Sequence, residues 1–319
     1  MFDWLRRRRL RAEYRRLLEQ VAVDLPAGRT AEAEASCIEA VRVAGELHGQ
    51  DHPELCTPLY VLASVRLAQE ATDGALEACQ RAVAIAKKAP GSTDPPLPRL
   101  LEQLAAIFER RGETDEVEGL YRTTLAGYDR MRAADPLEVA LLENRLALLL
   151  SRSGRREEAA PFFRHAIELR EKACGPAHAQ VAELLYNYAT FRPAAMKADE
   201  AESMLRRALA IAVAPGDSSA ALARVHAAIL HNLAVVCEEV DKIEEAASRY
   251  EEALAVKQRE VGERHKELRP TLVRLARLYA KTGRKGEAGP LYARALSIAQ
   301  DELGPDHEVV SALRTWMAE

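Results

Sequence analysis

The chain has 319 residues, of which 48% are apolar, 29% charged and 5% aromatic. This balance supports a folded core and excludes a disordered or fibrous protein. The formal net charge of −4, from 45 basic and 49 acidic residues, argues against a nucleic-acid-binding protein, which usually carries a basic domain or stripe. No apolar run is long enough to span a bilayer, and the five scattered cysteines form no CxxC pair. We therefore expect a cytoplasmic protein, and the dominance of Ala, Leu, Arg and Glu predicts that it is mostly helical.

The first 20 residues are strongly basic, with seven arginines against three acidic residues and a local net charge of +4. They lack the long apolar region of a secretory signal. Two interpretations stay open: this stretch extends the first helix of the fold, with Trp4 packed on it, or it lies on an anionic membrane or a partner. We favour the first, because so short an apolar set binds a membrane only marginally. The basic patch consists of Arg6, Arg7, Arg8, Arg9 and Arg11.

A period of 42 residues runs through the chain and predicts repeated helical hairpins. Small residues recur in pairs seven residues apart: Ala33 and Ala40, Ala75 and Ala82, Val117 and Thr124, Ala159 and Ala166, Ala201 and Ala208, Ala246 and Ala253, Ala288 and Ala295. Twelve residues before each pair stands the small column Val21, Ala63, Ala105, Ala147, Ala189, Ala234 and Ala276. A bulkier residue stands four residues after the first member of each pair, and we call these residues the plug column: Cys37, Cys79, Tyr121, Phe163, Leu205, Tyr250 and Tyr292. Small residues at fixed spacing indicate helices that cross closely, with one larger side chain filling the space between them.

These columns divide the chain into an extension, an array of seven repeats and a terminal helix. We expect the basic extension over 1–13, the array over 14–308 and a capping helix over 309–319. The repeats fall near 14–53, 54–95, 96–137, 138–179, 180–224, 225–266 and 267–308. A three-residue insertion is expected in the loop near 214–219. Turns within the hairpins are marked by Gly28, Gly112, Gly154 and Gly283.

One repeat carries a recognisable pattern, L-A-x2-Y at 275–279 followed by A-x3-Y at 288–292. It resembles the tetratricopeptide repeat, and the longer period with GQDHP, GPAH, GERH and GPDH junctions resembles the kinesin-light-chain type. The resemblance implies an all-α, right-handed superhelical solenoid of about seven helix-turn-helix repeats. In such a fold the first helix of each repeat (helix A) lines a concave groove and the second (helix B) packs behind it. The chain lacks a long heptad segment like the one that joins a kinesin light chain to its motor, so we do not interpret it as one.

The resemblance places candidate binding residues on the A helices, beside the small column or, for Arg152 and Lys281, one turn further. They are Asn144, Arg145, Arg152, Tyr186, Asn187, His231, Asn232, Arg274, Arg277 and Lys281. Asn side chains can hydrogen-bond an extended peptide backbone and Arg can bind a carboxylate. We therefore expect a groove for a peptide or loop of another protein that carries acidic residues. The alternative is that these positions are only the solvated faces of the A helices.

A metal site and a reactive thiol are two further interpretations of the sequence, and both have little support. His52, His178, His265 and His307 fall in equivalent turns, roughly 16–20 Å apart by two helix packings, too far to share a metal ion. We expect them to serve as turn or cap residues. Cys37 and Cys79 occupy the plug column, and Cys237 a bulky core column, so these thiols are expected in the core. No nucleophile with a base, paired carboxylate site or nucleotide-binding loop stands out.

The sequence thus predicts a non-catalytic adaptor or scaffold, without cofactor or metal, that binds another protein in its groove. The alternative is a regulatory or sensory protein. Its groove would be covered by its own terminus, or opened by a partner or small ligand, and its basic N-terminal helix would contact a membrane surface. We expect no nucleic acid among its partners, and self-association stays open. The Ala- and Arg-rich composition is typical of a GC-rich bacterial source.

Overall fold

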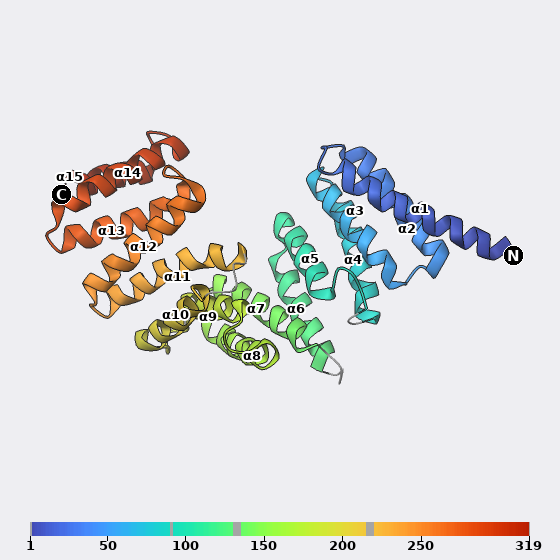
Figure 1. Cartoon of the computed structure of the whole chain (residues 1–319), viewed down its shortest axis with the longest axis horizontal. Helices are drawn as coiled ribbons and strands as arrows, with labels where there is room; N and C mark the ends of the chain where they lie inside the picture. Colours follow the sequence, from blue (N-terminus) through green and yellow to red (C-terminus); the bar gives the residue numbers. More distant parts are fainter. Residues whose placement is uncertain (1, 90–91, 130–134, 215–219, 319) are drawn as a thin grey trace. The chain divides into compact units, whose positions relative to one another are not determined.

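The chain is all-helical in a computed structural model that describes residues 2–89, 92–129, 135–214 and 220–318 (Figure 1). Fifteen α-helices and two short 3-10 helices, with no strand, make up the regular structure of these ranges. The helices follow one another as antiparallel hairpins, which confirms the predicted all-α solenoid of helical repeats. Two compact units divide the chain, Met1–Leu149 and Leu150–Glu319, and each is described by itself.

The first unit contains three hairpins. They pair α1 (Phe2–Asp24) with α2 (Thr30–His48), α3 (Cys56–Ala68) with α4 (Thr72–Lys88), and α5 (Leu97–Arg111) with α6 (Thr114–Asp129). The 3-10 helix η1 (Pro53–Leu55) leads into α3, and α7 (Pro136–Arg152) contains the division between the units. Consecutive hairpins also pack together through α2 with α3 and α4 with α5, so each apolar face is covered by the next repeat.

The second unit continues the same pattern. It begins with the last residues of α7, and α8 (Arg156–Cys174) packs on α9 (Ala179–Thr190). The hairpins pair α9 with α10 (Ala198–Ala212), α11 (Ala220–Glu239) with α12 (Ile243–Val261), and α13 (Arg269–Lys281) with α14 (Lys285–Leu303). The 3-10 helix η2 (Lys266–Leu268) precedes α13, and α15 (Glu308–Ala318) packs against α14. The loop with the expected insertion at 214–219 lies almost wholly outside the described residues.

The repeated small residues lie where the helices cross. Every member of the small column and of the small pairs is buried, and so is every member of the plug column. A Cβ methyl group or a Val side chain lets two helix backbones approach closely, and the Tyr, Phe, Leu or Cys plug fills the remaining space. The columns read from the sequence are therefore the core of the repeats.

The thiols are part of this core. Cys37, Cys79 and Cys237 are buried as predicted, and Cys56 is buried as well, with its thiol directed at the carbonyl of Ala82. Burial raises the pKa of the Cys79 thiol to about 12 and that of Cys56 to about 11, so both are protonated near neutral pH. Such thiols are poor nucleophiles, because the thiolate is the reactive form.

The turn inside each hairpin places one residue in the left-handed backbone region. Gly28, Gly112, Gly154 and Gly283 occupy this position with φ between 73° and 80°. In two other repeats the same position holds Glu70 and Asp241, at φ 61° and 59°. A side chain is strained in this region, and glycine is not. The turn geometry is thus kept even where the sequence lacks the residue that suits it best.

The turn between repeats uses glycine and histidine together. Gly49, Gly175, Gly262 and Gly304 end the preceding B helices with φ between 86° and 101°, and a histidine follows three residues later. In all four turns the histidine Nδ1 accepts the backbone N–H two residues ahead, over 3.2–3.4 Å. This is the geometry of a helix N-cap. The expected cap role of His52, His178, His265 and His307 is confirmed.

Candidate functional site

The structure distributes the candidate binding residues over four A helices. Asn144 and Arg145 stand on α7 in the first unit, and Arg152 ends the same helix in the second. The remaining candidates stand on α9, α11 and α13: Tyr186, Asn187, His231, Asn232, Arg274, Arg277 and Lys281. Their accessibility differs more than the repeat pattern suggests, because neighbouring A helices cover part of each position.

Two of the asparagines are withdrawn from the surface. Asn144 is only 4% exposed and Asn187 only 8%. The expectation that both amides are presented to a peptide backbone therefore needs correction, since buried amides in folded proteins serve mainly the interior. The other candidates are accessible: Arg145, Tyr186, His231 and Asn232 are half-buried, and Arg152, Arg274, Arg277 and Lys281 are exposed.

Asn232 links two consecutive A helices. Its Nδ2 donates to the Thr190 hydroxyl at 2.7 Å, and that hydroxyl donates to the backbone carbonyl of Tyr186, also at 2.7 Å. Asn232 stands two residues before the small column and Thr190 one residue after it in the preceding repeat. The first unit repeats this relationship between Gln103 and Ser64, whose Nε2 and Oγ are 2.7 Å apart. Polar residues at these two positions thus join neighbouring repeats and shape the A-helix surface.

His231 on α11 is half-buried against residues of α12 and α13. Its Nδ1 lies 3.0 Å from the hydroxyl of Thr271, and its ring meets Tyr250 edge-on with centroids 5.4 Å apart. Burial, with the charges of Lys257 and Arg274 as smaller causes, lowers the pKa of His231 to about 4. The ring is therefore neutral near pH 7, and it can offer a hydrogen bond but no positive charge.

The arginines are held loosely or by one partner. Arg145 donates to the Glu102 carboxylate at 2.6–2.7 Å within the first unit. In the second unit Arg274 lies 4.0 Å from Glu238, which is a weak ion pair at an exposed site. Arg277 stacks over the Trp316 ring at 5.4 Å. Arg274, Arg277 and Lys281 follow one another at spacings of three and four residues, so they share one face of α13.

Repeat five departs from the pattern. Helices α3, α11 and α13 extend five residues past their small column, whereas α9 ends one residue past Ala189. Pro193 explains the early end, because proline has no N–H for the helix bond and its ring clashes with the preceding turn. The chain then crosses to α10 through residues 191–197 without helical structure. The repeat pattern alone does not predict this break, although Pro193 is its signal in the sequence.

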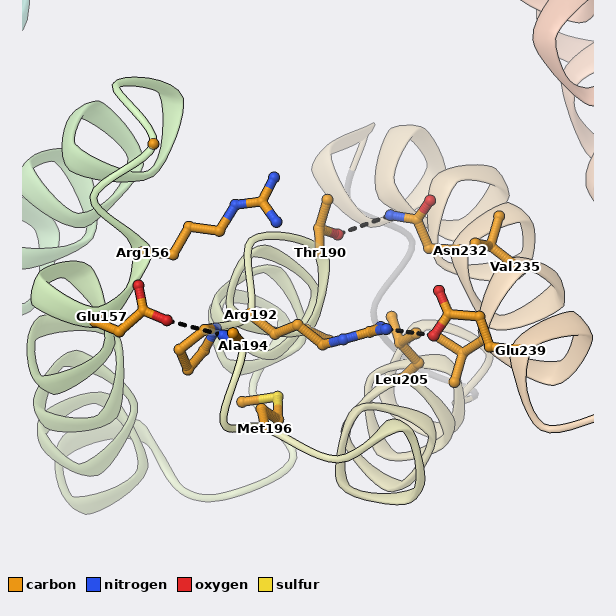
Figure 2. A pocket seen from close by; sticks show the side chains of 14 residues that line it. Arg156, Glu157, Thr190, Arg192, Ala194, Met196, Leu205, Asn232, Val235 and Glu239 are labelled. Atoms are coloured by element: carbon orange, nitrogen blue, oxygen red, sulfur yellow. Dashed lines mark hydrogen bonds and ion pairs between the residues drawn. The ribbon is translucent and has the colours of Figure 1, made fainter.

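A pocket of about 690 Å³ lies beside this break (Figure 2). Met196, Leu205 and Val236 supply buried apolar side chains, while Arg156, Glu157, Arg192, Asn232 and Glu239 supply polar ones. Figure 2 shows two contacts that fix its walls: Arg192 is ion-paired with Glu239, and the Ala194 N–H donates to Glu157 at 3.0 Å. We call this site the α9 pocket. Ligand sites commonly measure about 300–1,000 Å³, so its size suits a small group.

The basic residues at the N-terminus lie on α1. Arg6 lies 3.5 Å from Glu46 of α2, Arg8 stacks over the Trp4 ring at 5.5 Å, and Arg9 and Arg11 are exposed, as is Arg7. The stretch does extend the first helix, and Tyr14 ties α1 to the Glu54 carbonyl at 3.0 Å. Trp4, however, is 61% exposed. The expectation that it packs on the array is wrong, because the part of α1 that carries it stands clear of the core.

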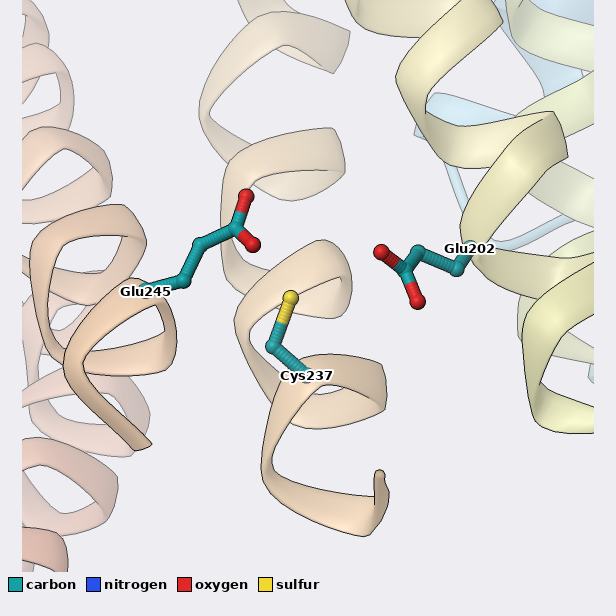
Figure 3. A group of neighbouring side chains, drawn as sticks. All are labelled: Glu202, Cys237 and Glu245. Atoms are coloured by element: carbon teal, nitrogen blue, oxygen red, sulfur yellow. The ribbon is translucent and has the colours of Figure 1, made fainter. Parts of the chain in front are cut away.

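Glu202, Cys237 and Glu245 form a cluster with metal-ligand atoms within 4.8 Å of one another (Figure 3). Protein cations already hold its carboxylates. Lys242 and Arg206 donate to Glu202 at 2.6 and 2.7 Å, and Arg206 also reaches Glu245 at 2.8 Å. These bonds lower the pKa of Glu202, with Lys242 as the first cause. We therefore interpret the cluster as an ion-pair network that joins α10 to α12 and to the turn between α11 and α12.

No helix among the described residues is long and apolar enough to cross a membrane.

Family comparisons agree with the repeat architecture. One tetratricopeptide repeat model matches residues 56–130, 138–214, 180–259 and 225–301, and a second matches residues 27–54. These matches cover most of the chain and coincide with the helical hairpins. No curated protein matches the sequence.

Solved structures with the same fold are distant in sequence. BtubC (BKLC) from P. vanneervenii is 22% identical with a TM-score of 0.61, over 77% of this chain and 92% of that chain. The nearly identical TPR-like repeats of a kinesin-light-chain-like protein from Podosopora anserina are 20% identical with a TM-score of 0.54, over 64% and 94%. The quorum sensor NprR from B. thuringiensis, in its apo form, is 14% identical with a TM-score of 0.60, over 90% and 77%. The predicted likeness to kinesin-light-chain-type repeats is confirmed, and at these identities the likeness concerns the fold.

Proposed function

The chain belongs to the tetratricopeptide repeat family, and from that premise we propose that it is a non-catalytic adaptor that binds a peptide or loop of another protein. Stacked helical repeats provide extended surfaces that change little on binding, so the ordering cost falls mainly on the partner segment. The proposed surface is the A-helix face of the second unit.

The observation that carries this proposal is the basic face of α13. Arg274, Arg277 and Lys281 are exposed on one side of the helix, and the ion pair between Arg274 and Glu238 is 4.0 Å long. Weakly held cations can exchange their present contacts for a ligand carboxylate at little cost. The expected ligand is therefore a segment with acidic residues. The half-buried Asn232 on α11 adds a polar group that could meet its backbone.

A non-catalytic role fits the state of the reactive groups. The buried thiols are protonated, and the Glu202 carboxylate is held by Lys242 and Arg206. A nucleophile or general base needs a partner group within hydrogen-bond reach and access to a substrate. Neither the thiols nor this carboxylate combines both conditions.

Selection of random displayed peptides against the purified chain tests the proposal. We expect enrichment of acidic sequences, whose affinity falls at least about 10-fold in the Arg274→Glu/Lys281→Glu variant, as loss of charge-assisted bonds predicts. The matched control is Arg259→Glu/Lys266→Glu, which makes the same change in charge at exposed sites on α12 and η2. Selection of no peptide, or equal weakening by both variants, would rule out this binding surface.

The alternative regulatory role makes a different prediction. If the N-terminus covered the binding surface, weakening its charge would raise peptide affinity. Deletion of residues 1–20 is unsuitable, because α1 is the packing partner of α2. The Arg8→Ala/Arg9→Ala variant changes only exposed side chains, and an adaptor without such control should bind the selected peptide unchanged.

A further inference from the structure

The break in α9 leaves a recess with a closed apolar floor. Leu205 is fully buried, Val236 is 3% exposed and Met196 is 8% exposed. These three side chains come from α10, α11 and the crossing segment, so the floor is supported from several sides. An aliphatic group that enters the recess would exchange water for apolar contact, which contributes about 25 cal/mol per Å² of apolar surface buried.

The charged side chains that line the α9 pocket differ in whether they already have a hydrogen-bond or ion-pair partner. Arg192 is paired with Glu239, and Glu157 accepts the Ala194 N–H. Arg156 is the exception: within the described residues its guanidinium makes no hydrogen bond or ion pair, and Figure 2 shows it pointing from α8 across the pocket toward Thr190. Among the residues that the structure describes, the pocket thus holds one cation without a partner, and both of its carboxylates are engaged.

This pattern selects the charge of a ligand. A cationic group would have to displace Arg192 from Glu239 or an N–H from Glu157 before it found a carboxylate. An anionic group meets Arg156 directly, while Arg192 stays paired with Glu239. The four charged side chains that line the pocket have a net charge of zero, so selection rests on the position of Arg156 and not on a general positive field. A planar carboxylate fits guanidinium donors in pairs, and this gives direction to the contact.

We propose that the α9 pocket receives an acidic side chain and a neighbouring aliphatic side chain of a bound protein segment. Arg156 binds the carboxylate, Arg192 stays paired with Glu239 at the pocket wall, and the aliphatic group rests on Met196 and Leu205. This inference rests on the proposed adaptor function and names one specificity site for it. Asn232 uses one amide hydrogen on Thr190 and borders the pocket, so it is placed to meet the segment's backbone.

The test uses defined probes and a reporter inside the pocket. The ε-methyl group of Met196, labelled with carbon-13 and assigned with a Met196→Leu variant, is followed by NMR while acetyl-Leu-Glu-amide is added to the full chain. We expect a saturable shift of the Met196 signal, and affinity about 10-fold lower for acetyl-Leu-Gln-amide, because the charge-assisted bonds are lost. Met317 lies on α15, outside the pocket, and its signal should stay unchanged.

Arg156→Ala should weaken the Glu probe to the level of the Gln probe, and Arg156→Lys should restore part of the difference. Arg155→Ala is the matched control, because the adjacent Arg155 is paired with Glu158 at 2.6 Å. An unmoved Met196 signal up to the solubility limit, equal binding of both probes, or no effect of Arg156→Ala would overturn the inference. If only the pocket proposal fails, peptides that bind the basic face of α13 will still be selected. If the proposed function fails, no such peptide will be selected, whatever the Met196 signal shows.

Discussion

The Asn232 side-chain amide donates to the Thr190 hydroxyl at 2.7 Å and so joins the A helices of two consecutive repeats. The same two positions hold Gln103 and Ser64 in the first unit, again 2.7 Å apart. A polar residue before the small column thus reaches back to a short hydroxyl residue after the small column of the previous repeat. Where this pair is present, the A-helix surface is fixed by a side-chain bond in addition to packing.

Thr190→Val should destabilise the second unit by about 1 kcal/mol, because it removes the acceptor for Asn232 while keeping the side-chain shape. Thr190→Ser keeps the hydroxyl and should lose much less. Urea denaturation followed by circular dichroism measures both. Equal losses in the two variants would mean that the methyl packing of Thr190, and not its hydrogen bond, stabilises the contact.

The repeats could be predicted well from the sequence, because helices that cross closely require small residues at a regular spacing. Only a small residue fits where helices cross, so Ala63 and Ala276 recur at a fixed period and need no structure to be found. His178 and its equivalents were likewise assigned to the turns from spacing alone. The helix crossings and the turns between repeats could therefore be predicted from the periodic residue columns.

The binding surface was predicted less well, because it depends on where individual side chains turn. Asn187 and Asn232 occupy the same column, yet the first is buried and the second is half exposed. The periodicity that identified the column says nothing about this difference. Pro193 was visible in the sequence, but the pocket that it opens also needs Arg156 and Glu239, which come from other repeats. Such departures from the repeat are where a specific site can arise.

His178→Ala should lower the stability of the second unit by about 1 kcal/mol, because the N-terminus of α9 loses the side chain that accepts the Gln180 N–H. His178→Asn offers a good capping acceptor and should restore most of the loss. Thermal or urea unfolding gives the comparison. A structural role other than capping would leave both variants equally destabilised.

Glu70→Gly and Asp241→Gly should each stabilise the chain, by up to about 1 kcal/mol, because both residues have positive φ in turns where other repeats use glycine. Aspartate tolerates this region better, so the gain at position 241 should be smaller. Glu77→Gly, an exposed position inside α4, should instead cost about 1 kcal/mol. Loss of stability in the two turn variants would show that the side chains contribute more than the backbone strain costs.

His231 should make folding stability depend on pH. Its folded pKa of about 4 lies below the ordinary value of about 6.5, so its contribution is complete above about pH 6.5 and is lost as the pH falls toward 4. Protonation would place a charge in a half-buried site beside Lys257 and Arg274, and the linked loss over this window is at most about 3 kcal/mol. Urea unfolding at pH 7 and pH 4.5 measures it in the wild type and in His231→Gln, whose amide does not titrate. The other histidines contribute equally to both proteins, so the wild type should lose more stability between the two pH values. An identical loss in the variant would show that His231 is readily protonated in the folded chain.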